Sequence, residues 1–363
     1  MRSRAIFPFL SVLLAAQPSA SVPVHQWTQH YGGSSHDGGA AVAFDTSWNV
    51  LVAGTSAKVA FIAKYDANGS ELWFQWLGEG QAFDVSTDPA GNVLITGAFG
   101  VYPVEAANPQ TSIFVVKLDP SGAQQWVRTF GTPGGTYDEG MGIAADASGA
   151  VLSTGRFLGT VNFGGTPLTS AGYEDIFVAK FDANGNHVWS RRAGSANFME
   201  YGFGITVDGE GNVVVTGTHY GPIDMGGGML PYGGKPDIFL AKYASDGSHV
   251  WSHGYGAGEF DFGIDVACDG SNNVLLLGRF GGSVDFGGGT LVSAGEGDVV
   301  VAKYDANGLH QWGQRFGSSG YSTGTGIAVD PSDNIFIAGA FPEIEDRLSR
   351  SRCWLGTLSD GAA

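Results

Sequence analysis

The chain has 363 residues, 59 of them glycine, and carries a formal net charge of −17 at pH 7. Such an acidic chain lacks the basic surface that meets phosphates, so we expect it to bind neither nucleic acid nor anionic lipid. The glycines fall at turns rather than in one tract, and 43 % of the residues are hydrophobic. This composition favours a core built from many short strands over a disordered chain.

Residues 1–20 have the layout of a secretory signal peptide. Two arginines precede an apolar run at 5–16, and small residues follow at 19–21. The apolar run is too short to span a bilayer, and no second stretch is long enough. We therefore expect cleavage near residue 20 and a single mature domain, 22–363, that is secreted to the periplasm or the medium as a soluble monomer.

A strand–turn–strand unit recurs along the chain, and its clearest copy runs from Asp175 to Trp189. Residues 176–181 alternate with a period of two and are largely apolar on both faces, as in a buried strand. The Asp-Ala-Asn-Gly sequence at 182–185 tolerates positive φ and predicts a tight turn. A worn copy lies at 354–361, and the clear copies close on a tryptophan: Trp73, Trp126, Trp189, Trp251 and Trp312.

A second signal runs in phase with the first: an apolar strand that ends in Asp, a turn, and an apolar strand that ends in Gly. The closing aspartates are Asp45, Asp88, Asp146, Asp208, Asp269 and Asp330. Each repeat therefore supplies four strands, which we name A to D, with D starting at the tryptophan. Equivalent tryptophans lie 46 to 63 residues apart, and four strands in such a period indicate a blade of an all-β β-propeller.

The chain begins with a D strand at Trp27 and ends with a C strand at 354–358. Strands A, B, C and D each occur six times in that count. We therefore predict six blades, with the N-terminal strand completing the last blade and closing the ring.

The motif Asp-x-x-Gly-Asn-Val-x-Val-Thr-Gly at 208–217, followed by Asp-Ile-Phe at 237–239 and its Ala-Lys-Tyr, resembles the bacterial SBBP ("seven-bladed β-propeller") repeat family. The resemblance covers nearly all of residues 26–341. It implies an exported bacterial propeller, and the family name implies seven blades where the repeats here number six.

Repeats three to five carry an additional glycine-rich segment between strands B and C. The segments are Gly159–Gly165, Gly221–Gly227 and Gly282–Gly288. We expect them to form small hairpins that project from adjacent blades on one face of the domain.

Acidic residues recur eight positions before the closing Asp of strand A, at Asp37, Asp138, Glu200 and Asp261. Because strand A is the innermost strand of a blade, these carboxylates are predicted to ring one mouth of the central channel. Oxygen ligands of this kind suit Ca²⁺, so they are the candidate metal ligands. The alternative is a solvated polar rim. Asp84 and Asp265, just before strand A, add to the predicted charge.

Other recurring side chains have structural interpretations. Four histidines, His25, His187, His249 and His310, lie on the D strands of different blades and are assigned to the polar outer face. The repeated lysines are expected to pair with turn aspartates, and the repeated tryptophans to pack between blades. Trp48 and Trp76 lie outside the pattern and are interpreted as local packing. Cys268 and Cys353 belong to different repeats, so their pairing stays open.

Catalytic motifs are missing: the chain has no Gly-x-Ser-x-Gly elbow, no paired-histidine zinc motif and no phosphate-binding glycine loop. We therefore predict a non-enzymatic binding or scaffold module for glycans or exported proteins. Its binding surface would be the hairpin face or the acidic channel mouth. The alternative is a carbohydrate-active hydrolase or lyase that uses Asp138, Glu200 and Asp261.

Overall fold

The computed structural model describes residues 26–30, 37–101, 110–132, 137–341, 352–353 and 356–358. The strands of this part of the chain all pair in antiparallel fashion. It contains no helix with the length and hydropathy needed to cross a membrane.

The first seven strands form one continuous sheet because β4 runs through two repeats. The first part of β4 pairs with β3 and its last part pairs with β5, so β4 is strand D of the first repeat and strand A of the second. The strands are β1 (Asp37–Phe44), β2 (Val50–Ser56), β3 (Val59–Tyr65), β4 (Glu71–Thr87), β5 (Val93–Val101), β6 (Gln110–Leu118) and β7 (Gln124–Phe130). We call the two halves sheets 1 and 2.

Sheets 3 to 6 follow in chain order, and in sheets 3 to 5 the strands lie in the order A, B, C and D across the sheet. Sheet 3 has β8 (Glu139–Ala145), β9 (Val151–Phe157), β12 (Asp175–Phe181) and β13 (His187–Ala193). Sheet 4 has β14 (Glu200–Val207), β15 (Val213–His219), β16 (Asp237–Tyr243) and β17 (His249–Tyr255). Sheet 5 has β18 (Phe262–Cys268), β19 (Val274–Phe280), β22 (Asp298–Tyr304) and β23 (His310–Phe316). Sheet 6 has β24 (Thr323–Val329), β25 (Ile335–Phe341), β26 (Arg352–Cys353) and β27 (Gly356–Leu358).

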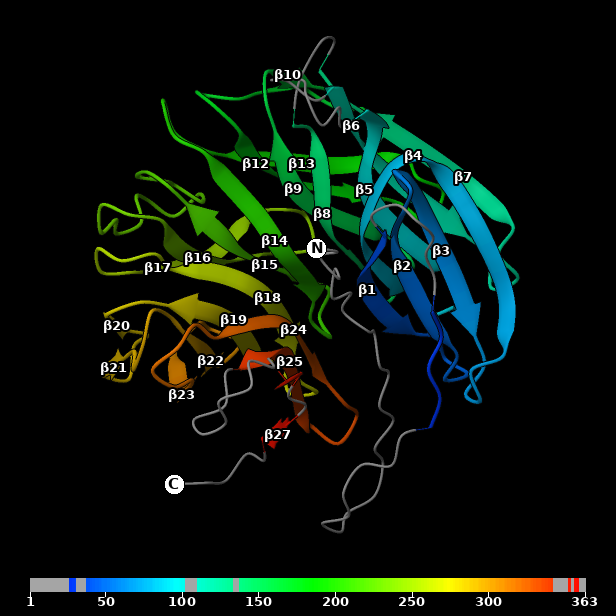
Figure 1. Ribbon diagram of the computed structural model, residues 1–363. Coiled ribbons are helices and arrows are strands. Elements are labelled where there is room, and N and C mark those ends of the chain that lie inside the picture. The colour runs from blue at the N-terminus through cyan, green and yellow to red at the C-terminus, as the bar shows by residue number, and fades with distance from the viewer. Residues whose placement is uncertain are drawn as a thin grey trace, which may run out of the picture.

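The sheets are arranged around a common centre with strand A of each sheet innermost (Figure 1). Consecutive inner strands contact each other in the series β1, β4, β8, β14, β18 and β24. Buried side chains of neighbouring sheets form shared clusters, as where Leu152 and Ile176 of sheet 3 meet Val213 and Phe239 of sheet 4. The predicted all-β propeller is therefore confirmed. The strand C predicted near the C-terminal end of the chain is also confirmed, because β27 pairs with β25.

The turn between strands A and B is held by the predicted aspartate. Asp45 accepts hydrogen bonds from the backbone nitrogens of Ser47 (2.8 Å) and Asn49 (2.9 Å). Its other oxygen lies 2.8 Å from Lys64 Nζ. The same pair recurs at 2.8–2.9 Å in the next four sheets, as Lys117–Asp88, Lys180–Asp146, Lys242–Asp208 and Lys303–Asp269. The predicted role of the repeated lysines is confirmed.

The repeated tryptophans join neighbouring sheets, as predicted. Trp126 on β7 donates its Nε1 hydrogen to Ala183 O (3.0 Å), in the C–D turn of the following sheet. Trp73, Trp189 and Trp251 make the same bond to the turns that follow them. At the N-terminus, Trp27 Nε1 donates to Ala67 O (3.1 Å) in the C–D turn of sheet 1. Trp27 thus contacts sheet 1 in the same way as the tryptophan of an outer strand contacts the following sheet. Residues 26–30 nevertheless form no strand in this structure.

The predicted hairpins are present in sheets 3 and 5, and a single bridge, Asp224 with Met229, closes the one in sheet 4. Their strands are β10 (Thr160–Val161), β11 (Leu168–Thr169), β20 (Ser283–Asp285) and β21 (Thr290–Val292). Several of their apolar side chains are buried. Phe163, for example, is buried and packs against Phe130 of sheet 2 at 4.9 Å between ring centroids. Each insert therefore fills the gap between its own sheet and the preceding one.

Candidate functional site

Most of the acidic residues predicted at the channel mouth are fully buried. Asp138, Glu200 and Asp261 are each 0 % exposed. Asp138 accepts hydrogen bonds from Thr132 N (2.7 Å) and Leu158 N (3.0 Å), which ties the loop before strand A to the end of strand B. This burial makes the solvated-rim interpretation wrong for these three residues.

The other members of the set have similar roles. Asp261 accepts from Gly281 N at 2.9 Å, and Glu200 accepts from Ser195 Oγ at 2.8 Å. Asp37 is partly exposed and accepts from Ser56 Oγ at 2.6 Å. Each carboxylate has its partners in its own sheet or in the loop that leads into it. The described residues contain no group of three His, Cys, Asp or Glu placed to hold a metal. The calcium site stays a prediction.

Burial makes these carboxyl groups weaker acids than exposed carboxyl groups. It raises the pKa of Asp138 to about 6 and those of Glu200 and Asp261 to about 7, because a desolvated carboxylate is unfavourable. A raised pKa suits a general acid, but a group with no exposed surface cannot reach a substrate in this conformation.

Asp84 and Asp265 clamp neighbouring inner strands together. Asp84 Oδ2 accepts from Ile143 N (2.8 Å) on β8, and Asp265 Oδ2 accepts from Ile327 N (2.9 Å) on β24. Burial raises the pKa of Asp84 to about 7, with a smaller contribution from the negative charge of Asp265, whose own pKa burial raises to about 6.

The histidines lie on separate outer strands, but the expected polar outer face is wrong for three of them. His187, His249 and His310 are half-buried. A Cβ on Gly165 would overlap the ring of His187, and the other two rings lie in the same way against the glycine pairs of their inserts. These histidines support the inserts. His25 lies outside the described residues.

Cys268 is a free, partly buried thiol, and burial raises its pKa to about 12. A thiol of this kind is a poor nucleophile at neutral pH. The side chain of Cys353 lies outside the described residues. The two tryptophans outside the repeat pattern, Trp48 and Trp76, touch Phe44 and Phe74 respectively, yet each is 58 % exposed.

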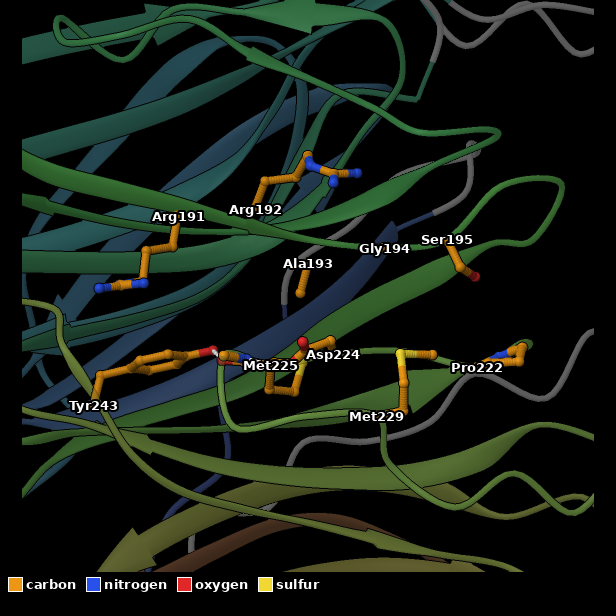
Figure 2. A pocket seen from close by; sticks show the side chains of 11 residues that line it. Arg191, Arg192, Ala193, Gly194, Ser195, Pro222, Asp224, Met225, Met229 and Tyr243 are labelled. Atoms are coloured by element: carbon orange, nitrogen blue, oxygen red, sulfur yellow. Dashed lines mark hydrogen bonds between the residues drawn. The ribbon is translucent and has the colours of Figure 1, made fainter.

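An open cleft of about 450 Å³ lies between sheets 3 and 4. One wall is the end of β13 and the residues after it, 191–195, and the other is the insert of sheet 4 from Pro222 to Met229. Figure 2 shows Arg191 and Arg192 extending to opposite sides of β13, with Arg191 on the side of Tyr243. We call this the Arg191 cleft.

The two arginines differ in their partners. Arg192 Nη1 donates to the buried carboxylate of Asp175, and the Arg192 side chain is 33 % exposed. The Arg191 guanidinium carbon lies 5.6 Å from the centroid of the Tyr243 ring. Among the described residues Arg191 has neither a hydrogen bond nor a close ion pair. Its five N–H donors are therefore available to a ligand.

The opposite wall offers one fixed negative charge and an apolar surface. Asp224 Oδ1 accepts from Gly226 N (2.7 Å) and Gly228 N (2.9 Å). These backbone hydrogen bonds hold the pKa of Asp224 below its usual value, so it is ionised at neutral pH. Met229 is 63 % exposed.

Sequence reasoning missed this cleft. A visible signal was the pair Arg191–Arg192, the one place in this acidic chain where two arginines are adjacent. The pair is informative only because the sheet 4 insert packs beside β13. An alignment of the repeats alone does not predict that packing.

A family model agrees with the β-propeller fold. Residues 311–340 match the SBBP family, described as a beta-propeller repeat. An uncharacterized WD repeat-containing protein of Acanthamoeba polyphaga mimivirus is 23 % identical over 361 residues, which cover 78 % of this chain and 26 % of that protein. This chain therefore spans about a quarter of that relative.

Among solved structures, a protein of unknown function from Bacteroides caccae has a TM-score of 0.42 at 12 % identity, covering 78 % of this chain and 85 % of that one. The Dos1 propeller has a TM-score of 0.44 at 10 % identity, covering 85 % of this chain and 67 % of that one.

Proposed function

We propose that this chain, which carries an SBBP β-propeller repeat at residues 311–340, is a non-enzymatic binding module whose partner is another exported protein. In this proposal the N-terminal signal directs secretion, and the mature domain is a six-bladed ring closed by the N-terminal strand. The contact of Trp27 with the sheet 1 turn supports closure, because it repeats the contact between successive sheets.

One observation carries the binding role: the accessible cleft presents an uncommitted cation, whereas the candidate catalytic acids are buried. Arg191 faces the cleft without a hydrogen-bonding partner in the described structure. Asp138, Glu200 and Asp261 have no exposed surface and already accept hydrogen bonds. A surface built in this way can recognise a partner but offers no acid–base pair to a substrate.

A panel of glycans and peptides, screened for both binding and turnover with Ca²⁺ and again with EDTA, tests the proposal. We expect peptide binding without turnover. Hydrolysis or cleavage of a glycan that disappears in the variant Asp138→Asn/Glu200→Gln/Asp261→Asn would establish the enzyme instead. Glycan binding that requires Ca²⁺ would indicate a lectin and would support the predicted metal ligands.

A further inference from the structure

We propose that the Arg191 cleft binds an extended peptide segment that pairs with the free edge of β13 and places one acidic side chain against Arg191. This inference rests on the proposed function and names the chemistry of the partner.

The repeats themselves show that Arg191 departs from the pattern of its equivalents. Two residues after the tryptophan, other repeats use their side chain to reach the glycine carbonyl in the next C–D turn. Arg128 Nε donates to Gly185 O (3.0 Å), and His253 Nε2 lies 2.9 Å from Gly308 O. Gln29 and Gln75 donate to the corresponding carbonyls of Gly69 and Gly122.

Arg191 has no such bond to the turn of sheet 4, although that turn is described. Its guanidinium lies over Tyr243 and lines the cleft. A side chain that elsewhere joins two sheets is here left available to a ligand.

The second observation is the edge of β13. This strand is the outermost of its sheet, in the order β13-β12-β9-β8, so its far side pairs with no strand in the described structure. Alternate residues of an edge strand direct their N–H and C=O groups away from the sheet. Arg191 and Arg192 lie on opposite faces of β13, and both line the cleft. The cleft therefore opens along the strand edge itself.

An extended peptide fits this geometry. Residues 191–193, the end of β13, span about 10 Å, the length of roughly three residues of a partner. Strand addition satisfies the backbone groups of the edge, and side chains supply specificity. A carboxylate on the partner can bind the guanidinium of Arg191 in a bidentate manner.

The remaining lining limits what else the peptide can carry. Asp224 on the opposite wall disfavours a second acidic residue, and the exposed Met229 favours an apolar neighbour. An acidic glycan is a weaker fit because the aromatic residue of the cleft, Tyr243, is 2 % exposed and offers no open ring face for a sugar.

The test uses the full chain and a fluorescein-labelled octapeptide of alternating Val and Thr with one central Glu, followed by fluorescence anisotropy. We expect saturable binding. Replacing the Glu of the peptide by Gln should weaken binding about tenfold or more, since a charge-assisted bond is lost. Methylating alternate backbone nitrogens of the peptide should abolish it.

Arg191→Gln is the matched protein variant, because glutamine already occupies this position at Gln29 and Gln75 and bonds to the following turn. It should keep the melting temperature and weaken peptide binding about tenfold or more. Arg128→Gln makes the same change one sheet away and should leave binding unaltered.

Three outcomes would overturn the inference: no binding of the Glu peptide, equal loss in both arginine variants, or stronger binding of oligogalacturonate that competes at Arg191. Each is distinguishable from failure of the binding-module proposal, because that failure requires turnover dependent on the buried acids.

Discussion

Lys117 Nζ lies 2.8 Å from Asp88 Oδ2, and each side chain is 2 % exposed. Removing one member of a buried pair leaves the other charge desolvated and unbalanced. Lys117→Met should therefore lower the free energy of unfolding by about 3 kcal/mol or more, as measured by urea denaturation.

The control for that change is Lys235→Met, which breaks an exposed pair with Glu259. It should cost under about 1 kcal/mol, as exposed pairs do. Equal costs for the two lysines would contradict the structural role given to the buried pairs.

The glycine inside strand B is expected to be essential where the neighbouring inner strand comes closest. A Cβ on Gly217 would overlap Tyr201 O, whereas one on Gly278 would lie 3.1 Å from Phe262 O. Gly217→Ala should destabilise the domain by about 2 kcal/mol or more through overpacking, and Gly278→Ala by clearly less. Thermal unfolding of the two variants compares them directly, and a reversed order would show that the inner strand beside Gly217 can move away from the added methyl group.

Closure by the N-terminal segment predicts a measurable stabilisation. Deleting residues 1–30 instead of 1–20 removes Trp27 and its bond to Ala67 O. If the segment completes the ring, the melting temperature should fall by about 5 °C or more. Trp48→Phe, at a 58 % exposed position, serves as the neutral control. An unchanged melting temperature after the longer deletion would mean that the ring closes without this segment.

Stability should also fall as pH rises from about 4 to 7. Burial raises the pKa of Asp84 to about 7, so the folded state keeps a proton that the unfolded state releases near pH 4. Over that interval the folded protein binds more protons, and the free energy of unfolding decreases with rising pH. Asp138, Glu200 and Asp261 act in the same direction.

Asp45 acts in the opposite direction at lower pH. Although burial works to raise its pKa, hydrogen bonds from Lys64 and Asn49 lower it to about 2, so its contribution is lost as pH falls below about 4. Calorimetry should thus find a higher melting temperature at pH 4.5 than at pH 7.5. Asp84→Asn should reduce the pH dependence of the free energy of unfolding by up to the contribution of one bound proton. An unaltered pH dependence would mean that Asp84 is ionised in the folded protein.

The fold was largely readable from the sequence because each recurring residue performs a local task. Asp45 and its equivalents cap turns, Trp126 and its equivalents join sheets, and the alternation in 176–181 marks a strand buried on both faces. These tasks depend on residues close in the chain or one repeat away, so periodicity reveals them.

The site was less readable because it depends on packing between repeats. The sequence placed Asp138 and Asp261 at a channel mouth, but it did not show that backbone amides would enclose them. It treated the inserts as projecting hairpins, whereas Phe163 and Met225 are buried. The Arg191 cleft forms because the insert of sheet 4 packs beside β13, the outer strand of sheet 3.

The uninterrupted run of β4 has a mechanical consequence. From sheet 3 onward a loop joins the outer strand of one sheet to the inner strand of the next, and such a loop can be cut or can bend while both sheets remain intact. Between sheets 1 and 2 the link is a single strand, Glu71–Thr87, hydrogen-bonded along both parts. The first two sheets should therefore exchange amide hydrogens and resist proteases as one cooperative unit, and limited digestion should release them together.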